Sequence, residues 1–186
     1  MQESVRNHIK NIAVVISAAM FFSCTNSVKE VNDFLADKNL PIGEAFEINH
    51  IHTDSGRVDV KMRTPLMLDF KNRADHPYNE FPEGLIITTF EKNGDSTTIK
   101  GDFARSYAKT SVSEMKGNVV VINHAMAHKL MTDQIYWDQL TGYFFTERNF
   151  VFYTQTDTIY GKGFEATQDL KRWWVRNQSG IIELSE

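Results

Sequence analysis

Cysteine is nearly absent from this sequence, with one residue, Cys24, in a chain of 186. A single cysteine cannot form an intramolecular disulfide, so a scaffold held together by disulfides is excluded. A basic surplus is absent too, because the net charge is -4 at pH 7, and this argues against a nucleic-acid-binding protein. The 41% hydrophobic and 12% aromatic residues suffice to bury one core, so we expect one folded domain.

The apolar run near the N-terminus is short. Residues 12–22, IAVVISAAMFF, make 11 positions, whereas a helix that spans a bilayer needs roughly 20. The run follows the basic residues Arg6 and Lys10 and ends before the small residue Ser23. This pattern predicts a secretory signal peptide over residues 1–23, with an uncleaved anchor as the alternative.

Cys24 directly follows Ser23, and the ending FFSC resembles a bacterial lipobox in which Phe21 replaces the usual leucine. We therefore predict that Cys24 is lipidated and tethers the mature chain in the periplasm of a Gram-negative cell, with the inner membrane favoured and the outer membrane as the alternative. Two or three acyl chains hold a protein stably, because each buried methylene contributes roughly 0.8 kcal/mol. A free thiol after an ordinary signal peptide is the alternative.

Residues 24–44 are polar with scattered apolar positions and are expected to be a linker between lipid and domain. Helical spacing relates Val28, Val31 and Phe34, so a short helix is expected before Pro41 ends it. A linker without regular structure fits the composition equally well.

Strand patterning begins at Ala45. Residues 57–63 alternate most clearly, with charged residues at the odd positions and apolar residues at Val58, Val60 and Met62. This predicts a strand with one buried and one solvated face. Thr64-Pro65 predicts a bend, because proline cannot donate a hydrogen bond to a sheet.

The even positions of residues 66–70 are apolar and are expected to continue the same face after the bend. Residues 71–84 contain two prolines and a glycine and are expected to form a loop. Asn-Gly-Asp at residues 93–95 predicts a hairpin turn, and residues 111–166 alternate between further turns. Without a convincing helix after residue 41, residues 45–186 predict an all-β barrel, sandwich or jelly roll.

Four glycines lie inside these strand-like runs. Glycine within a strand indicates a bulge or a close approach of two backbones, with a simple break in register as the alternative. The four are Gly101, Gly117, Gly161 and Gly163.

No catalytic motif interrupts the strands. No serine lies in a G-x-S-x-G elbow, and Cys24 is predicted to be acylated. His50 and His52 share a strand face, and His124 and His128 flank a turn, but their spacing supplies neither a third zinc ligand nor its support. We expect no catalytic residues, no metal and no cofactor. Paired carboxylates are defined by separation in space, so hydrolase activity stays as an alternative.

Five segments form a composite pattern in chain order: DSGRVDVKMRTPLM, EFPEGLIITTFEKNGD, MKGNVVV, LMTDQIYWDQ and YGKGFEATQDL. Together with the N-terminal signal and spacer, they resemble the LptC family of periplasmic lipopolysaccharide export proteins over roughly residues 45–186. The resemblance implies a twisted antiparallel β-jelly roll with two sheets and an apolar interior groove.

The resemblance also implies a non-enzymatic function. Such a protein takes lipopolysaccharide from the permease subunits of an inner-membrane ABC transporter and shields its acyl chains in the roll. It then passes the molecule, through its sheet edges, to a periplasmic bridge protein of the same fold. Family members are commonly anchored by one transmembrane helix, whereas a lipid on Cys24 would supply only the tether here.

Under this interpretation the apolar strand faces line the lipid groove: Val58, Val60, Met62, Val119, Val121, Ile135, Trp137, Phe150 and Phe152. A charge at Val119 or Phe152 is expected to block transport or folding, whereas one at Asn123 is not. The basic residues at positions 57, 61 and 63 are expected on a solvated outer face rather than at lipid phosphates. The alternatives are a periplasmic lipoprotein β-sandwich that binds carbohydrate or another lipid, and a jelly-roll hydrolase.

Overall fold

The computed structural model describes residues 27–179, so the predicted signal peptide and Cys24 lie outside the described residues. Helix α2 (Val28–Asp37) begins at Ser27. The Ser27 hydroxyl accepts a hydrogen bond from the Glu30 amide at 3.1 Å, and the Glu30 carboxylate accepts one from the Ser27 amide at 3.0 Å. This capping box satisfies amides that the first helical turn leaves unpaired. The structure thus has the short helix that the apolar spacing predicts.

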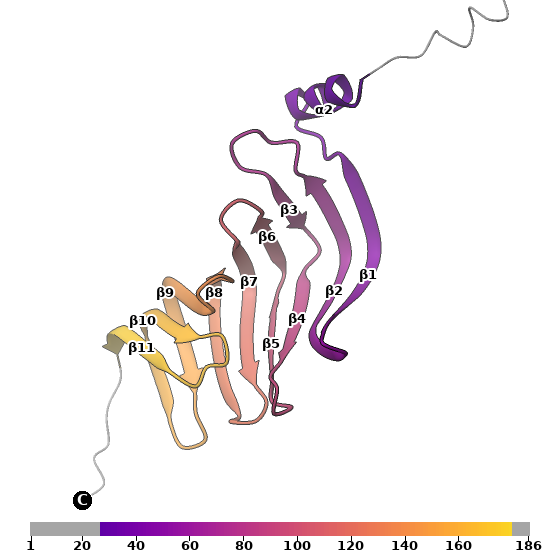
Figure 1. Cartoon of the computed structure of the whole chain (residues 1–186). Coiled ribbons are helices and arrows are strands. Elements are labelled where there is room, and N and C mark those ends of the chain that lie inside the picture. Colours follow the sequence, from indigo (N-terminus) through magenta and orange to yellow (C-terminus); the bar gives the residue numbers. More distant parts are fainter. Residues whose placement is uncertain (1–26, 180–186) are drawn as a thin grey trace, which may run out of the picture.

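Eleven strands follow, all paired antiparallel in the described residues, which confirms the all-β prediction. They are β1 (Gly43–Asp54), β2 (Arg57–Phe70), β3 (Tyr78–Phe81), β4 (Leu85–Phe90), β5 (Ser96–Gly101), β6 (Phe103–Tyr107), β7 (Val112–Asn123), β8 (His128–Asp138), β9 (Tyr143–Tyr153), β10 (Thr158–Thr167) and β11 (Trp173–Ser179). Figure 1 shows a twisted row of strands from β1 and β2 to β10 and β11, with α2 at the β1–β2 end. Within residues 27–179, no helix is long and apolar enough to cross a membrane.

Strand β3 lies inside residues 71–84, which the sequence predicts to be a loop. It pairs with β2 on one side and with β6 on the other. Only four residues separate Pro77 from Pro82, too few for an alternating pattern to be visible. The loop prediction is therefore wrong at this strand.

Two long strands change partners along their length, and this folds the sheet into two layers. β2 pairs with β4 over residues 60–63 and with β3 over residues 68–70. β7 pairs with β5 over residues 120–123 and with β6 over residues 112–116. β4 and β5 therefore complete one layer, here called the β4–β5 layer, while β3 and β6 complete the β3–β6 layer. The long strands run through both layers, which is the predicted jelly-roll architecture.

The long strands bend where they pass from one layer to the other. In β7 the pairing register shifts between Lys116 and Val119, where Gly117 and Asn118 have φ angles of 73° and 47°. β10 shifts in the same way around Gly163, whose φ angle is 81°. An extra residue in one strand bends it and increases its twist, so these bulges form the crease between the layers.

Two further glycines allow close packing. A Cβ atom at Gly161 would lie 2.5 Å from the carbonyl oxygen of Asn177. One at Gly101 would lie 2.5 Å from the Met115 side chain. Two of the four strand glycines thus lie at bulges and Gly161 at a close approach of two backbones, as the sequence predicts, whereas Gly101 lies against a side chain.

The bend in β2 reverses which positions face inward. Before Pro65 the even positions Val60 and Met62 pack against the core, whereas after it the odd position Met67 does so. Phe70, an even position, instead stacks on Tyr78 with ring centroids 4.8 Å apart, outside the core cluster. The expectation that the even positions after Pro65 continue the inward face is therefore wrong.

Candidate functional site

The interior between the layers holds most of the predicted groove residues. Five are buried in one core cluster: Val119, Val121, Ile135, Phe150 and Phe152. Three more pack against that cluster and are partly buried: Val60, Met62 and Trp137. Val58 differs, because its side chain is 38% exposed beside the β1–β2 turn. Contact of these residues with lipid stays a prediction.

The β7–β11 half of the interior is densely packed. The Phe164 ring lies 5.0 Å from both Phe150 and Phe152 across the layers, and Trp173 lies 5.2 Å from Phe152. In the middle of the roll, where β3 to β8 enclose the interior, the cavity beside Ile99 measures about 10 Å³. A space of this size holds no more than a water molecule. Away from the β1–β2 end, the apolar interior is therefore filled by its own side chains.

The β10–β11 turn (residues 168–172) closes this half of the interior. It contains Leu170, which is completely buried. The side-chain nitrogen Nδ2 of Asn123 donates a hydrogen bond to the backbone carbonyl oxygen of Asp169 at 2.6 Å, and His128 Nδ1 lies 3.1 Å from the backbone carbonyl oxygen of Leu170. Because Asn123 and His128 belong to the opposite layer, the turn joins the two layers at their free edge.

A cluster of charges surrounds the β10–β11 turn. The Lys171 ammonium lies 2.8 Å from Glu91, 3.4 Å from Asp95 and 3.8 Å from Asp169. Burial of Asp169 raises its pKa, but hydrogen bonds from Thr167 and the Lys171 amide outweigh it and hold the pKa below the usual value. These contacts link the turn to the β4–β5 hairpin of the opposite layer.

Asn123 is not on a solvated face, contrary to the expectation from the sequence. It is 1% exposed and lies on the same strand parity as Val119 and Val121. Its side-chain oxygen also accepts a hydrogen bond from the Met126 amide at 2.8 Å. The parity and the position just before a turn are the sequence signals that identify this role.

The β1–β2 end of the interior is open. In the described part of the chain, β1 has no buried side chain. Its residues Ile48 and His50 pair with Thr64 and Met62 of β2, and so share the inward face with them. Only β2 pairs with β1 within residues 27–179, so the backbone groups on its outer edge have no strand partner there.

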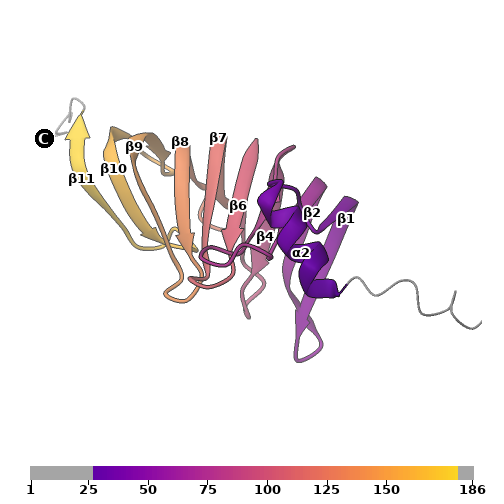
Figure 2. The same cartoon turned by 90° about the horizontal axis from the view of Figure 1, so that it is seen from above.

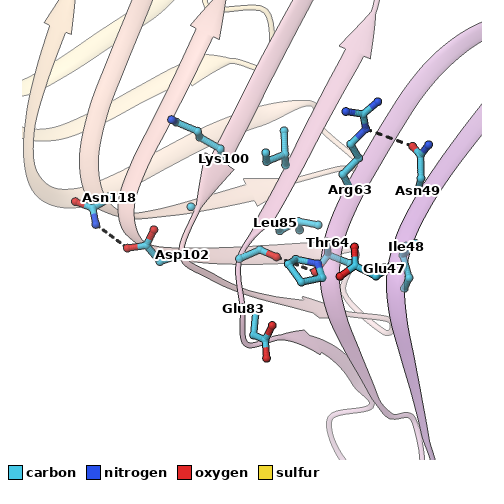
Figure 3. A pocket seen from close by; sticks show the side chains of 14 residues that line it. Glu47, Ile48, Asn49, Arg63, Thr64, Glu83, Leu85, Lys100, Asp102 and Asn118 are labelled. Atoms are coloured by element: carbon cyan, nitrogen blue, oxygen red, sulfur yellow. Dashed lines mark hydrogen bonds between the residues drawn. The ribbon is translucent and has the colours of Figure 1, made fainter.

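A hollow of about 700 Å³ lies at the crease, where β2 and β7 change partners (Figure 3). Beside this hollow, the Thr64 hydroxyl of β2 donates a hydrogen bond to the Gly84 carbonyl oxygen at 2.7 Å and so holds the β3–β4 connection against β2. Arg63 and Lys100 extend to the same side of this hollow in Figure 3. Arg63 Nε donates to Asn49 at 3.4 Å. Arg57, Lys61 and Arg63 are all exposed, as expected for the solvated face of β2.

The outer face of the β3–β6 layer carries an ion-pair network that is structural. Arg105 Nη2 lies 2.5 Å from a Glu80 carboxylate oxygen on the neighbouring strand. Burial of Glu114 raises its pKa, but Lys116 at 2.9 Å and Gln134 outweigh it and lower the pKa. Each member lies beside an oppositely charged or hydrogen-bonding partner on its own strand or a neighbouring one. In residues 27–179, no three histidine, cysteine or acidic residues gather where a metal ion could bind.

The sequence matches the family model described as "Lipopolysaccharide-assembly, LptC-related" over residues 17–179. The match covers α2 and all eleven described strands. Comparison with curated proteins finds no match. Because the family model spans most of the chain and the fold is an antiparallel roll with an apolar interior, the chain belongs to the LptC family and has a role in lipopolysaccharide transport.

Proposed function

We propose that this protein carries lipopolysaccharide through the periplasm without chemical change. It takes the molecule from the permease subunits of an inner-membrane ABC transporter and passes it to the next periplasmic bridge protein. The observation that supports this most directly is the continuous apolar interior, which extends from Met62 on β2 to Trp173 on β11. Neither a metal nor a cofactor takes part, and no residue acts as a catalyst.

The apolar interior lowers the cost of moving acyl chains through water. Exposing an acyl chain of about a dozen carbons costs on the order of 10 kcal/mol, at roughly 0.8 kcal/mol per methylene. Several chains on one molecule multiply this cost. Inside the roll, the acyl chains contact side chains such as Met62, Val119 and Phe150 instead of water.

Entry of cargo requires the two layers to separate, because the enclosed cavity between them beside Ile99 measures only about 10 Å³. The β10–β11 turn holds the layers together near Asn123 and Leu170. The β1–β2 end has no comparable connection among the described residues, and Met62 is already partly exposed there. We therefore propose that acyl chains enter at the β1–β2 end and displace core side chains as they advance.

The two edge strands suit the transfer between proteins. In the described residues β1 pairs with β2 alone and β11 with β10 alone, and these strands lie at opposite ends of the row in Figure 1. Unpaired edges accept a strand from another protein. We assign β1 to the transporter and β11 to the bridge protein, so that apolar interiors join across each contact.

The anchor completes the proposal. Residues 1–23 are removed as a signal peptide, Cys24 is acylated, and residues 24–44 connect the lipid to the roll of residues 45–186. The protein then acts in the periplasm at the inner membrane. Mass spectrometry of the mature N-terminus tests this part, and an unmodified Cys24 or an intact Met1 contradicts it.

Photo-crosslinking in cells tests the transport proposal. A photoreactive residue at Met62 or at Phe150 is expected to form adducts with lipopolysaccharide. The same residue at Leu140, which is 78% exposed in the β8–β9 turn, serves as the control and is expected to form none. Folded variants that give no adduct from either interior position contradict the proposal, and adducts with a different lipid favour a general lipid-binding protein. Depletion of the protein is expected to leave lipopolysaccharide at the inner membrane.

A further inference from the structure

The segment that precedes the sheet exposes an apolar surface. Helix α2 has no buried residue in the described structure. Val28 is 78% exposed and Phe34 58%, and Val31 is exposed as well. Leu40 and Ile42, which follow the helix, extend this exposed surface toward β1. We call these five residues the α2 flank.

The helix is amphipathic, but the domain covers only part of its apolar side. Side chains three or four positions apart share one side of a helix, which groups Val31 with Phe34 and Leu35. Leu35 is half-buried, whereas Phe34 is exposed. Lys29, Asp33 and Asp37 form the opposite, polar side at i, i+4 spacing.

The loop after β2 fixes the helix to the roll. The Asn72 side chain donates to the Asn32 carbonyl oxygen at 3.1 Å. Arg73 Nη2 donates to Asn39 at 3.0 Å, and its guanidinium lies 5.0 Å from the Phe70 ring centroid. Figure 2 shows α2 beside the β1–β2 end of the row. Whatever covers the α2 flank therefore also sets the orientation of the sheet.

The length of the chain before α2 points to a lipid bilayer as the partner. Three residues separate Cys24 from Val28, and four Cα steps of at most about 3.6 Å keep the helix start within about 14 Å of Cys24. A lipid on Cys24 therefore brings α2 to the bilayer surface. Amphipathic helices bind there by burying their apolar side at the boundary of headgroups and acyl chains.

We propose that the α2 flank lies in the headgroup region of the membrane that holds Cys24, with the polar side of α2 toward water. The inference rests on the proposed lipid anchor. This contact directs the open β1–β2 end of the roll toward the membrane from which cargo arrives. Because the helix carries three acidic residues and one basic residue, binding depends on apolar contact and takes place on zwitterionic lipid.

A fluorescent label tests the contact, since Cys24 is the single cysteine of the chain and its lipidation leaves no other thiol. Phe34→Cys and Asp33→Cys variants of the full lipidated chain are labelled with an environment-sensitive dye and added to phosphatidylcholine vesicles. The two positions are adjacent in sequence and about 100° apart around the helix axis, so position 34 lies on the apolar side and position 33 at the centre of the polar side. We expect a blue shift and quenching by headgroup-region doxyl lipid for the label at position 34, and neither for position 33.

The outcomes separate the inference from the proposed anchor. Flotation of the labelled chain with the vesicles reports the anchor independently of the dye. Flotation with equal, unshifted emission at both positions overturns the inference and leaves the anchor intact. Absence of flotation contradicts both. A shift at position 34 that needs no vesicles and grows with protein concentration would mean that a second copy of the chain covers the α2 flank. A shift that appears only when the transporter is present would mean that a protein covers it. Either result overturns the bilayer contact.

Discussion

The β7–β11 half of the roll and its β1–β2 end are built from strands with the same alternating pattern, yet only the first is densely packed. In the packed half, aromatic rings from both layers interlock and the β10–β11 turn connects the free edges. At the β1–β2 end the outermost strand has a neighbour on one side only, and its side chains stay exposed. Alternation therefore determines which face points inward, whereas opposing layers and closing turns determine whether that face is covered.

The largest expected effect on the free energy of unfolding comes from a charge placed in the core, compared with the same charge at the β1–β2 end. Val119→Asp is expected to destabilise the fold by about 4 kcal/mol, because the carboxylate has no partner in the core. Met62→Asp, on the partly exposed β2, is expected to cost about 1 kcal/mol. Urea denaturation measures both values. Equal losses would remove the distinction between the packed and open regions.

The closing turn provides the next comparison. Asn123→Ala removes the hydrogen bonds to the Asp169 carbonyl and Met126 amide and is expected to cost about 1 to 3 kcal/mol. Hydrogen exchange should accelerate in residues 168–172 before it does in β1 and β2. Asn149→Ala, an exposed position on β9, is the control and should change little. Uniform acceleration through the sheet would argue against a local closure.

Low pH should weaken the contacts that hold the β10–β11 turn to the opposite layer. The folded pKa of Asp169 lies below its usual value of 3.8, so its stabilising contribution is present above about pH 4 and is lost as pH falls through the folded pKa. The expected loss is under about 1 kcal/mol, because solvent screens these partly exposed charges. Asp169→Asn should remove this part of the pH dependence in denaturation between pH 5 and 2. An unchanged profile would contradict the role of the carboxylate.

The smallest effect is expected at Val58. Because its side chain is 38% exposed, Val58→Asp should change the free energy of unfolding by no more than about 0.5 kcal/mol. Thermal denaturation measures this, with Val60→Asp as the more damaging neighbour. A large loss at Val58 would mean that the β1–β2 end is more closed than its exposure indicates.

Much of this architecture is readable from the sequence, because periodicity reports which face of a strand points inward. The alternation of residues 111–166 locates the inward face at Val119, Phe150 and Phe152, and the family-specific segments indicate the jelly roll. The reversal after Pro65 is not readable, since a bend changes the inward parity without changing the apolar pattern. The role of the β10–β11 turn is not readable for another reason, because it depends on partners such as Asn123 and Glu91, which are far away in the chain.

The partner changes of β2 and β7 have a mechanical consequence. Backbone pairing runs from β2 through β4, β5, β7, β6 and β3 and returns to β2, which forms a closed circuit. A strand in such a circuit cannot slide without breaking the pairing on both of its sides. The strands from β2 to β7 are therefore held by pairing on both sides, whereas β1 on one side and β8–β11 on the other lie outside the circuit and can shift without breaking it.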